Sequence, residues 1–131
     1  MDNDSVNESS RYRILVTGYR HWKDPAVIYK ALTTHIADSP FGTNHVTIVH
    51  KNSGGADRTA EKYAVDFSIR SERHVANWRK YGKAAGPLRN QEMVDAGADI
   101  CLAFLDPLSV GTKDCLQRAA VAGIPIARFY A

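Results

Sequence analysis

Short, continuously apolar runs alternate with amphipathic helical patterns along most of the chain, and this alternation constrains the fold more than any other feature. A strand is expected at 13–17, closed by Gly18, and another at 99–105, and both runs lack a polar face. Strands of this kind are buried on both faces, as in a parallel sheet covered by helices. Further strands are expected at 45–50, near 73–76 and in the tail of 123–127.

Single helices are expected between these strands. Asp24-Pro25 predicts a helix start, with Asp at the cap and Pro in the first turn, and apolar residues follow on one face from Val27 to His35. Later patterns include Ala60 to Phe67, Leu88 to Val94 and Leu116 to Ala120, at helical spacing. Parallel strands joined by right-handed helical crossovers predict an α/β fold: a single Rossmann-like, doubly wound parallel sheet of about five strands, with helices on both faces.

The composition sets wider limits. A chain of 131 residues has the length of one domain, and a net charge of +3 with a pI near 9.0 gives only a slight preference for anionic partners. The polar residues 1–10 are expected to form a flexible leader before a domain at 11–131. No apolar run reaches the roughly 18 residues of a membrane span, and no hydrophobic signal core opens the chain, so we expect a cytoplasmic protein without membrane contact.

Cys101 and Cys115 lack metal-ligand spacing and are expected to be buried thiols in a reducing compartment, although a disulfide or a catalytic thiol remain alternatives. The histidines also lack such spacing, so no metal site is expected, and no cofactor is predicted.

Glycine, hydroxyl and basic residues gather in the loops that follow the strands. Glycine allows close approach of the backbone to an anion, helix N-termini attract phosphate, and Arg binds phosphate through two parallel hydrogen bonds. Because the carboxyl ends of parallel strands share one edge of the sheet, these loops predict a phosphate-directed pocket there. The predicted ligand-binding residues are Thr17, Gly18, Tyr19, Arg20, Trp22, Ser53, Gly54, Gly55, Asp57, Arg89, Asn90, Gly111 and Thr112.

Several of these residues have two interpretations. Arg20 is interpreted as a ligand contact at the pocket mouth, whereas Trp22 fits either a base-stacking ring or a residue that seats the first loop. Asp57 fits either a helix cap or a partner for a ribose hydroxyl or a nearby Arg. Thr112 is expected in or near a helix cap. Arg89 and Asn90 are expected at the start of the third helix, where an Arg needs an anion to compensate it.

These motifs together resemble the SLOG superfamily, in particular its YspA-like, cpYpsA-related branch. The resemblance covers about residues 12–129 and is carried by the motifs 16–20 with Trp22, 54–57, Gly86-Pro87-x-Arg89-Asn90-x-x-Met93, 111–114 and 119–125. It implies a Rossmann-like fold that binds nucleotides or nucleotide-derived ligands, often as a sensor, and it implies a homo-oligomer, since relatives commonly pair through helices.

The resemblance extends to the "lonely guy" phosphoribohydrolases, in which an Arg and a Glu carry the chemistry. Arg89, followed by Met93, corresponds to that Arg, but Cys115 stands at the position of the Glu, with Asp114 one residue earlier. A thiol replaces a carboxylate poorly at an oxocarbenium-like transition state. Arg89 and Asp114 are therefore the only catalytic candidates, and binding without catalysis is favoured.

Three functions remain open from the sequence. The first is binding of a nucleotide or nucleotide-derived small molecule, as a sensor or a sequestering protein. The second is a phosphoribohydrolase or N-glycosidase that acts on a nucleoside monophosphate. The third is single-stranded nucleic acid binding, because aromatic and cationic residues alternate at 78–83, although a solvated basic loop would have the same composition.

Overall fold

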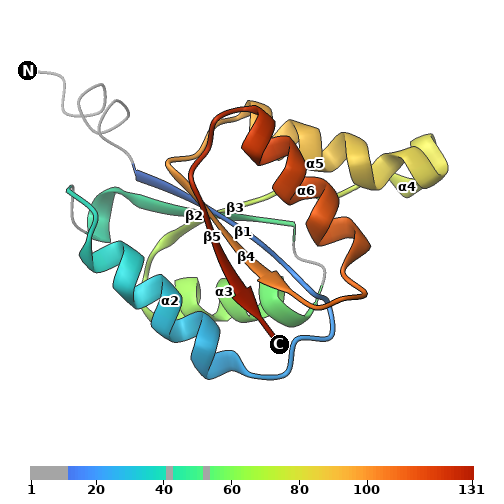
Figure 1. Ribbon diagram of the computed structural model, residues 1–131. Helices are drawn as coiled ribbons and strands as arrows, with labels where there is room; N and C mark the ends of the chain where they lie inside the picture. Colours follow the sequence, from blue (N-terminus) through green and yellow to red (C-terminus); the bar gives the residue numbers. More distant parts are fainter. Residues whose placement is uncertain (1–11, 41–42, 52–53) are drawn as a thin grey trace, which may run out of the picture.

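The described residues form one five-stranded parallel sheet with the order β3-β2-β1-β4-β5 (Figure 1). This computed structural model describes residues 12–40, 43–51 and 54–131. The leader predicted at 1–10 lies outside these ranges. The strands are β1 (Tyr12–Gly18), β2 (Val46–His50), β3 (Arg70–Arg73), β4 (Ile100–Leu105) and β5 (Ile126–Tyr130). The predicted fold class is confirmed.

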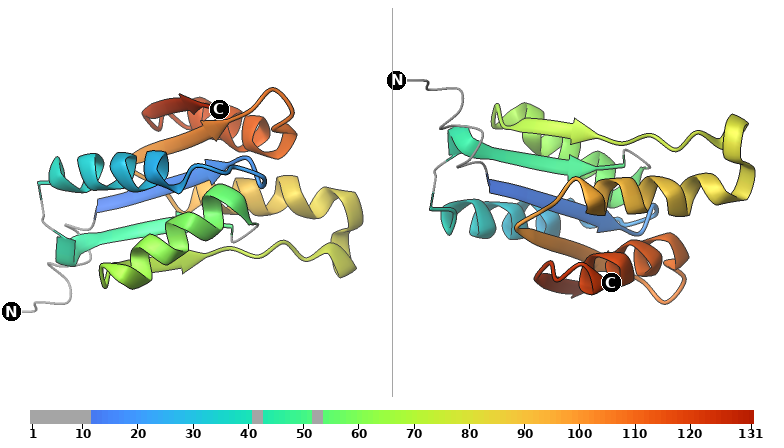
Figure 2. Two further views of the ribbon diagram at one scale, coloured as in Figure 1. Left: turned by 90° about the horizontal axis from the view of Figure 1, so that it is seen from below. Right: turned by 90° about the horizontal axis from the view of Figure 1, so that it is seen from above.

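Helices cover both faces of the sheet (Figure 2). One face carries α2 (Pro25–Ala37) and α3 (Gly55–Asp66), and the other carries α5 (Ala85–Asp95) and α6 (Val110–Val121). The shorter elements are α4 (Trp78–Tyr81) and the 3-10 turns η1 (Thr43–His45) and η2 (Gly82–Ala84). The chain winds outward from β1 to β3 and then returns to β4, so the strand order reverses between β1 and β4. Among the described helices, none is long and apolar enough to cross a membrane.

Successive residues of the central strand pack into hydrophobic cores on opposite faces of the sheet. Ile14 and Val16 of β1 pack on the side of α2 and α3, whereas Leu15 packs with Met93 and Cys115 on the side of α5 and α6. All of these side chains are fully buried. A strand with both faces covered is built mainly from apolar side chains, which explains the apolar run in the sequence.

The predicted start of the first helix is confirmed. The Asp24 carboxylate accepts a hydrogen bond of 3.1 Å from the Ala26 amide, and Pro25 is the first helical residue. Pro at this position costs no hydrogen bond, because the first backbone amides of a helix have no partner within it. Ile28, Leu32 and Ile36 then turn their side chains into the core.

The third strand lies earlier than the sequence predicts, at Arg70–Arg73 instead of 73–76. It is an edge strand that pairs only with β2, and its own residues are polar and largely exposed. A polar edge strand has no apolar pattern in the sequence, so the strand was predicted at the apolar pair Val75-Ala76 instead. Val75 is in fact exposed.

The segment expected as a loop at 78–87 is mainly helical. Asn77 caps α4, its side-chain oxygen accepting a hydrogen bond of 3.0 Å from the Lys80 amide, and η2 then leads into α5 at Ala85. Arg89 and Asn90 therefore lie in the second turn of α5 and not at its start. The prediction that Arg89 opposes a helix dipole at an N-terminus was wrong.

Some strand boundaries and the exposure of two apolar side chains also differ from the prediction. His45 belongs to η1, β5 runs to Tyr130, and both Leu88 and Phe67 are about half exposed, at 49% and 55%. Phe67 follows the last residue of α3, where the helix no longer holds its side chain over the sheet.

Gly18 at the end of β1 lets α3 approach the sheet closely. A Cβ atom on Gly18 would lie 2.3 Å from the Ala56 Cβ and 3.1 Å from the Phe104 Cβ. The first distance is far below van der Waals contact. The start of α3 and the end of β1 can therefore approach each other this closely only with glycine at position 18.

Gly18→Ala is expected to lower the free energy of unfolding by about 1–3 kcal/mol, the usual effect of overpacking a core. Chemical denaturation would measure it. Gly111→Ala is the matched control, because its nearest neighbour, Lys51 Nζ, would lie at 3.6 Å and helical Ala is favoured over Gly. Equal stability of Gly18→Ala and wild type would contradict the close-packing account.

An ionic network joins the central strand β1 and the edge strand β3 to α5. The Arg13 guanidinium donates two hydrogen bonds to the Glu72 carboxylate, at 2.8 and 3.0 Å. His74 lies between Glu72 and Glu92, at 2.7 and 2.6 Å. The hydrogen bonds from Arg13 and the hydrogen bond with His74 lower the pKa of Glu72 to about 2. Burial acts in the opposite direction but is outweighed.

Because the pKa of Glu72 is depressed in the folded state, its contribution to stability is complete above pH 4.5 and is lost as the pH falls towards 2. Glu72→Gln is therefore expected to unfold more easily than wild type at pH 7, with a difference that shrinks between pH 4.5 and 2. Urea titrations across this range would measure it. A constant difference at every pH would show that the charge of Glu72 is not the cause.

Candidate functional site

A cavity of about 410 Å³ lies at the carboxyl edge of the sheet, where the strand order reverses between β1 and β4. This is the place where doubly wound sheets bind ligands. The loop after β1, the residue after β2, the two helices of the α5–α6 face and α4 all contribute to it. We call it the switch-point cavity; its lining residues are Gly18, Tyr19, Arg20, Lys51, Trp78, Arg89, Leu108, Ser109, Val110, Gly111 and Thr112.

Cationic side chains give this cavity its chemistry. Arg20, Lys51 and Arg89 line it, and no carboxylate is among the described residues that line it. Across the described ranges, none of these three cations forms a salt bridge. Lys51 is only 8% exposed. Three cations at one cavity create a positive potential, so the cavity is electrostatically suited to an anion.

Arg89 is held in place by its neighbour on α5. Its Nε donates a hydrogen bond of 2.9 Å to the Asn90 side-chain oxygen. Burial lowers the pKa of the Arg89 guanidinium, while the nearby carboxylates of Asp57 and Asp114 oppose this change. An arginine keeps its charge at neutral pH despite such a shift. The guanidinium is therefore a fixed cation at the cavity wall.

The N-terminus of α6 forms another wall. Ser109 precedes the helix but makes no capping hydrogen bond with its side chain, which instead accepts a bond of 2.9 Å from the Asp106 amide. Gly111 and Thr112 belong to the first turn, where backbone amides lack partners within the helix. Thr112 was expected in or near the cap position; the cap is Ser109, and Thr112 lies three residues later. The first turn of α6 is a surface that favours anions.

Asn90 and Asp114 lie behind the cavity and connect α5 with α6. The Asn90 amide donates to Asp114 at 2.9 Å and to the Gly111 carbonyl at 3.4 Å. Burial would raise the pKa of Asp114, but hydrogen bonds from Arg118 and Asn90 outweigh it and lower the pKa. Neither residue lines the cavity. Asn90 positions Arg89, and Asp114 is directed to another part of the surface.

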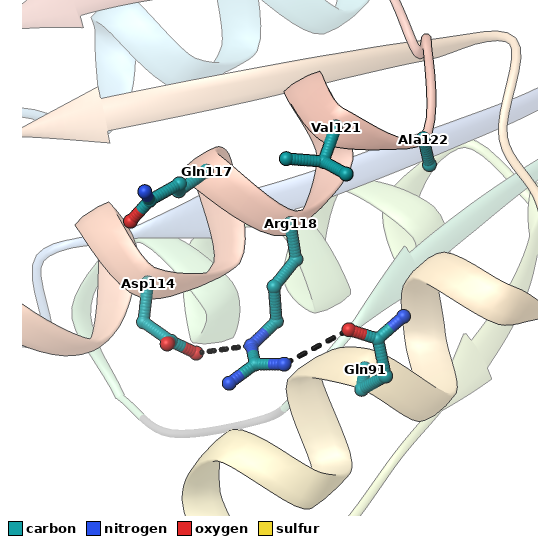
Figure 3. A pocket seen from close by; sticks show the side chains of 6 residues that line it. All are labelled: Gln91, Asp114, Gln117, Arg118, Val121 and Ala122. Carbon is teal, nitrogen blue, oxygen red and sulfur yellow. Dashed lines mark hydrogen bonds and ion pairs between the residues drawn. The ribbon is translucent and has the colours of Figure 1, made fainter.

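That other surface is a cavity of about 510 Å³ between α5 and α6, shown in Figure 3. Arg118 reaches from α6 to Asp114 and to Gln91, both at 2.9 Å. The Arg118 cation of this cavity is thus already neutralised by Asp114, and the Asp114 carboxylate would repel a phosphate. Despite its larger volume, this α5–α6 cavity is poorly suited to the predicted ligand.

Other predicted residues support the cavity without lining it. Gly54 and Gly55 turn the chain into α3 with φ of 75° and 48°, and a Cβ on Gly55 would meet the Arg20 carbonyl oxygen. Thr17 is buried in β1, with its hydroxyl beside Cys115. Asp57 is buried in the first turn of α3 and acts electrostatically on Arg89. Ser53 lies outside the described residues.

Trp22 is directed into the core and away from the switch-point cavity. Its ring packs edge-on against Phe104, and its Nε1 donates a hydrogen bond of 2.8 Å to the Asp24 carbonyl. It contributes, with Tyr19, to a separate cavity of about 410 Å³ beside β5. We call this the β5-side cavity; it is lined by Tyr19, His21, Trp22, Lys23, Asp24, Val27, Asp106, Tyr130 and Ala131.

Five residues that line the switch-point cavity were not among the predicted site residues: Lys51, Trp78, Leu108, Ser109 and Val110. Lys51 and Trp78 bear most on its chemistry. Lys51 directly follows a buried strand, a position from which its side chain reaches the carboxyl edge. This position after a strand could have been recognised in the sequence, but the burial of Lys51 could not. Trp78 was recognised only as part of a basic loop, because its place depends on the unexpected α4.

Both cysteines are buried, and neither forms a disulfide. Burial raises the pKa of the Cys115 thiol, although the Thr17 hydroxyl and Lys51 oppose it, and burial likewise raises the pKa of Cys101. Thiols of this kind are poor nucleophiles. The position that holds the catalytic Glu in the phosphoribohydrolases is thus occupied by an inert side chain within the core.

The doubly wound sheet and its switch-point cavity define a Rossmann-like α/β protein. The model of the YspA, cpYpsA-related SLOG family matches residues 12–81, more than half of the chain. The protein therefore belongs to the YspA, cpYpsA-related SLOG family, as its motifs predicted.

Two individual proteins show how far this similarity extends. The chain is 44% identical over 122 residues to the Gene 61 protein of Mycobacterium phage D29, covering 89% of this chain and 95% of that one. Its fold is similar to DNA processing protein A (DprA) from Streptococcus pneumoniae, with a TM-score of 0.71 at 15% identity, covering 90% of this chain and 50% of the other. This chain thus spans half the length of the DprA chain, and the likeness concerns the fold alone.

Burial of both thiols predicts that the folded protein resists thiol reagents at neutral pH. Reaction with a coloured disulfide reagent is expected to be slow in buffer and to reach two thiols per chain in denaturant. Cys115→Ala should leave the slow rate in buffer unchanged. A rapid reaction that disappears in this variant would instead show an accessible, activated Cys115.

Proposed function

We propose that the protein binds a nucleotide or a nucleotide-derived small molecule in the switch-point cavity, as a sensor or a sequestering protein. The observation that carries this proposal is the set of three cations, Arg20, Lys51 and Arg89, which form no salt bridge within the described residues and lie beside the first turn of α6. Charged donors and helix amides together form the usual phosphate site of Rossmann-like folds. A volume of about 410 Å³ is within the range for small-molecule pockets.

The geometry favours binding over hydrolysis of an N-glycosidic bond. That reaction needs a carboxylate at the sugar, and none lines the cavity. The candidate Asp114 is engaged by Asn90 and Arg118 and lines the α5–α6 cavity instead. Arg89 is thus proposed as a binding residue without an acidic partner for catalysis.

Single-stranded nucleic acid is the second candidate ligand. The observation in its favour is the exposed group Trp78, Arg79, Lys80 and Tyr81 of α4 at one end of the cavity. Exposed aromatic rings among cations are typical of single-strand binding. The similar fold is that of a protein named for DNA processing.

Calorimetry with nucleoside mono- and diphosphates, ADP-ribose and pyrophosphate tests the main proposal. Lys51→Met and Arg89→Met are each expected to weaken binding about 10- to 100-fold, because each removes a charge-assisted contact worth roughly 1.5–3 kcal/mol. Arg118→Met is the matched control, since its cation lies in the α5–α6 cavity and is already paired.

Absence of binding to every compound at millimolar concentration would refute the proposal, as would equal losses in Arg118→Met. Two further measurements separate the alternatives. Free base released from a nucleoside monophosphate, and lost in Arg89→Ala, would establish hydrolysis. Binding of an oligonucleotide that is tighter than that of any mononucleotide, and falls steeply with salt, would establish the second candidate.

A further inference from the structure

Trp78 lies at the wall of the switch-point cavity and is nevertheless 58% exposed. Of the chain's two tryptophans, the other, Trp22, is buried in the core. An indole offers a large apolar face, and leaving it in water forgoes the stabilisation that burial would provide. Trp78 therefore contributes little to the core, and the cavity is the feature that its ring adjoins.

The position of the Trp78 ring is set by neighbouring helices. Asn77 caps the turn that carries it, and Gly86 at the start of α5 lies beside the six-membered part of the indole. A Cβ on Gly86 would approach the indole Cη2 to 3.2 Å and Cζ2 to 3.9 Å. The absence of a side chain at Gly86 gives the ring a close-fitting seat, which orients an exposed face before any ligand arrives.

The cations lie within the same cavity. Arg89 follows Gly86 by one turn of α5, and Lys51 and Arg20 complete the lining. Trp78 has no ring partner in the described residues, and the one cation–π contact found there joins Lys80 to Tyr81. An aromatic face and a phosphate site thus border one cavity, with no protein group stacked on the ring.

We propose that Trp78 is the base-stacking platform of the site: the aromatic base of a nucleotide stacks on its indole while the phosphates contact Arg20, Lys51 and Arg89. This inference rests on the proposed function and narrows its ligand class. The ligand carries an aromatic base in addition to phosphate, so phosphosugars and inorganic phosphates bind only the cationic half. Stacking is tolerant of base identity, because every base has a π-face.

The β5-side cavity is the competing place for the base. It shares Tyr19 with the switch-point cavity and contains Tyr130, which is 71% exposed. However, its Trp22 ring is packed against Phe104, and Asp24 and Asp106 place carboxylates beside it. The Trp78 wall is free of carboxylates, and the base is assigned there.

Calorimetry of Trp78→Ala, Trp78→Phe and Tyr130→Ala tests the assignment, with ADP, GDP, CDP and UDP as nucleotides and pyrophosphate as the base-free probe. Trp78→Ala is expected to weaken nucleotide binding roughly 5- to 150-fold, the range for loss of one stacked base, and to leave pyrophosphate binding unchanged. Trp78→Phe should retain most of the nucleotide affinity, and Tyr130→Ala should match wild type.

Other outcomes would contradict the stacking role or the proposed function. Equal losses for nucleotides and pyrophosphate in Trp78→Ala would overturn the stacking role, as would a nucleotide-specific loss in Tyr130→Ala alone. If wild type binds pyrophosphate and nucleotides equally well, the site is for phosphate only and the inference fails while the anion site stands. If wild type binds neither, the proposed function fails and the inference falls with it.

Fluorescence gives an independent readout. ADP is expected to quench wild-type emission, and Trp78→Phe, which retains only the buried Trp22, should lose this quenching while still binding ADP. Pyrophosphate should not quench the wild type, since it has no base. Quenching by ADP that persists in Trp78→Phe would contradict the proposal, because the reporter would then be Trp22.

Discussion

The close approach of α3 to the end of β1 at Gly18 determines where the site residues lie. Because the helix starts against the strand, the loop that carries Tyr19 and Arg20 is pressed over the carboxyl edge. The Ala56 amide donates to the Tyr19 carbonyl at 3.4 Å, and the Tyr19 amide donates to the Phe104 carbonyl at 2.9 Å. The loop is thereby fixed between α3 and β4, with Arg20 at the mouth of the cavity.

Electrostatics at this edge of the sheet then supports the proposed function. Within the described residues, the largely buried Lys51 and the partly buried Arg89 form no salt bridge, whereas Arg13 and Arg118 are paired with Glu72 and Asp114. Asp114 is paired with Arg118 in the neighbouring cavity, and the charged side chains among the described residues that line the switch-point cavity are all cations. A phosphate would supply the missing charge and regain the energy spent on burying the cations.

The sequence was sufficient to predict the central part of the fold. The strands at β1, β2 and β4 are buried on both faces, so their apolar runs were unmistakable, and Asp24-Pro25 marked a helix start through local chemistry alone. The edge strand β3 could not be found in this way, because a strand that contacts the sheet on one side needs few apolar residues. The short helix α4 depends on the Asn77 cap and on its contact with α5, and composition at 78–83 resembled a loop.

The site was predicted less completely than the fold. Six predicted residues line one cavity, since strand ends and helix starts converge in any doubly wound sheet, and their role in binding stays a prediction: Gly18, Tyr19, Arg20, Arg89, Gly111 and Thr112. The directions of individual side chains were not predictable: Trp22 is directed inward, Asn90 supports Arg89, and Asp114 belongs to the α5–α6 cavity. Lys51 was overlooked because a lysine after a strand is ordinarily a solvated residue, and only its burial reveals its importance.

A crystal structure of the protein with pyrophosphate would test the central claim most directly. The account predicts phosphate oxygens within hydrogen-bonding distance of Lys51 Nζ and the Arg89 guanidinium, at the first turn of α6. Pyrophosphate bound at Arg118 between α5 and α6, or an empty switch-point cavity at saturating concentration, would contradict it.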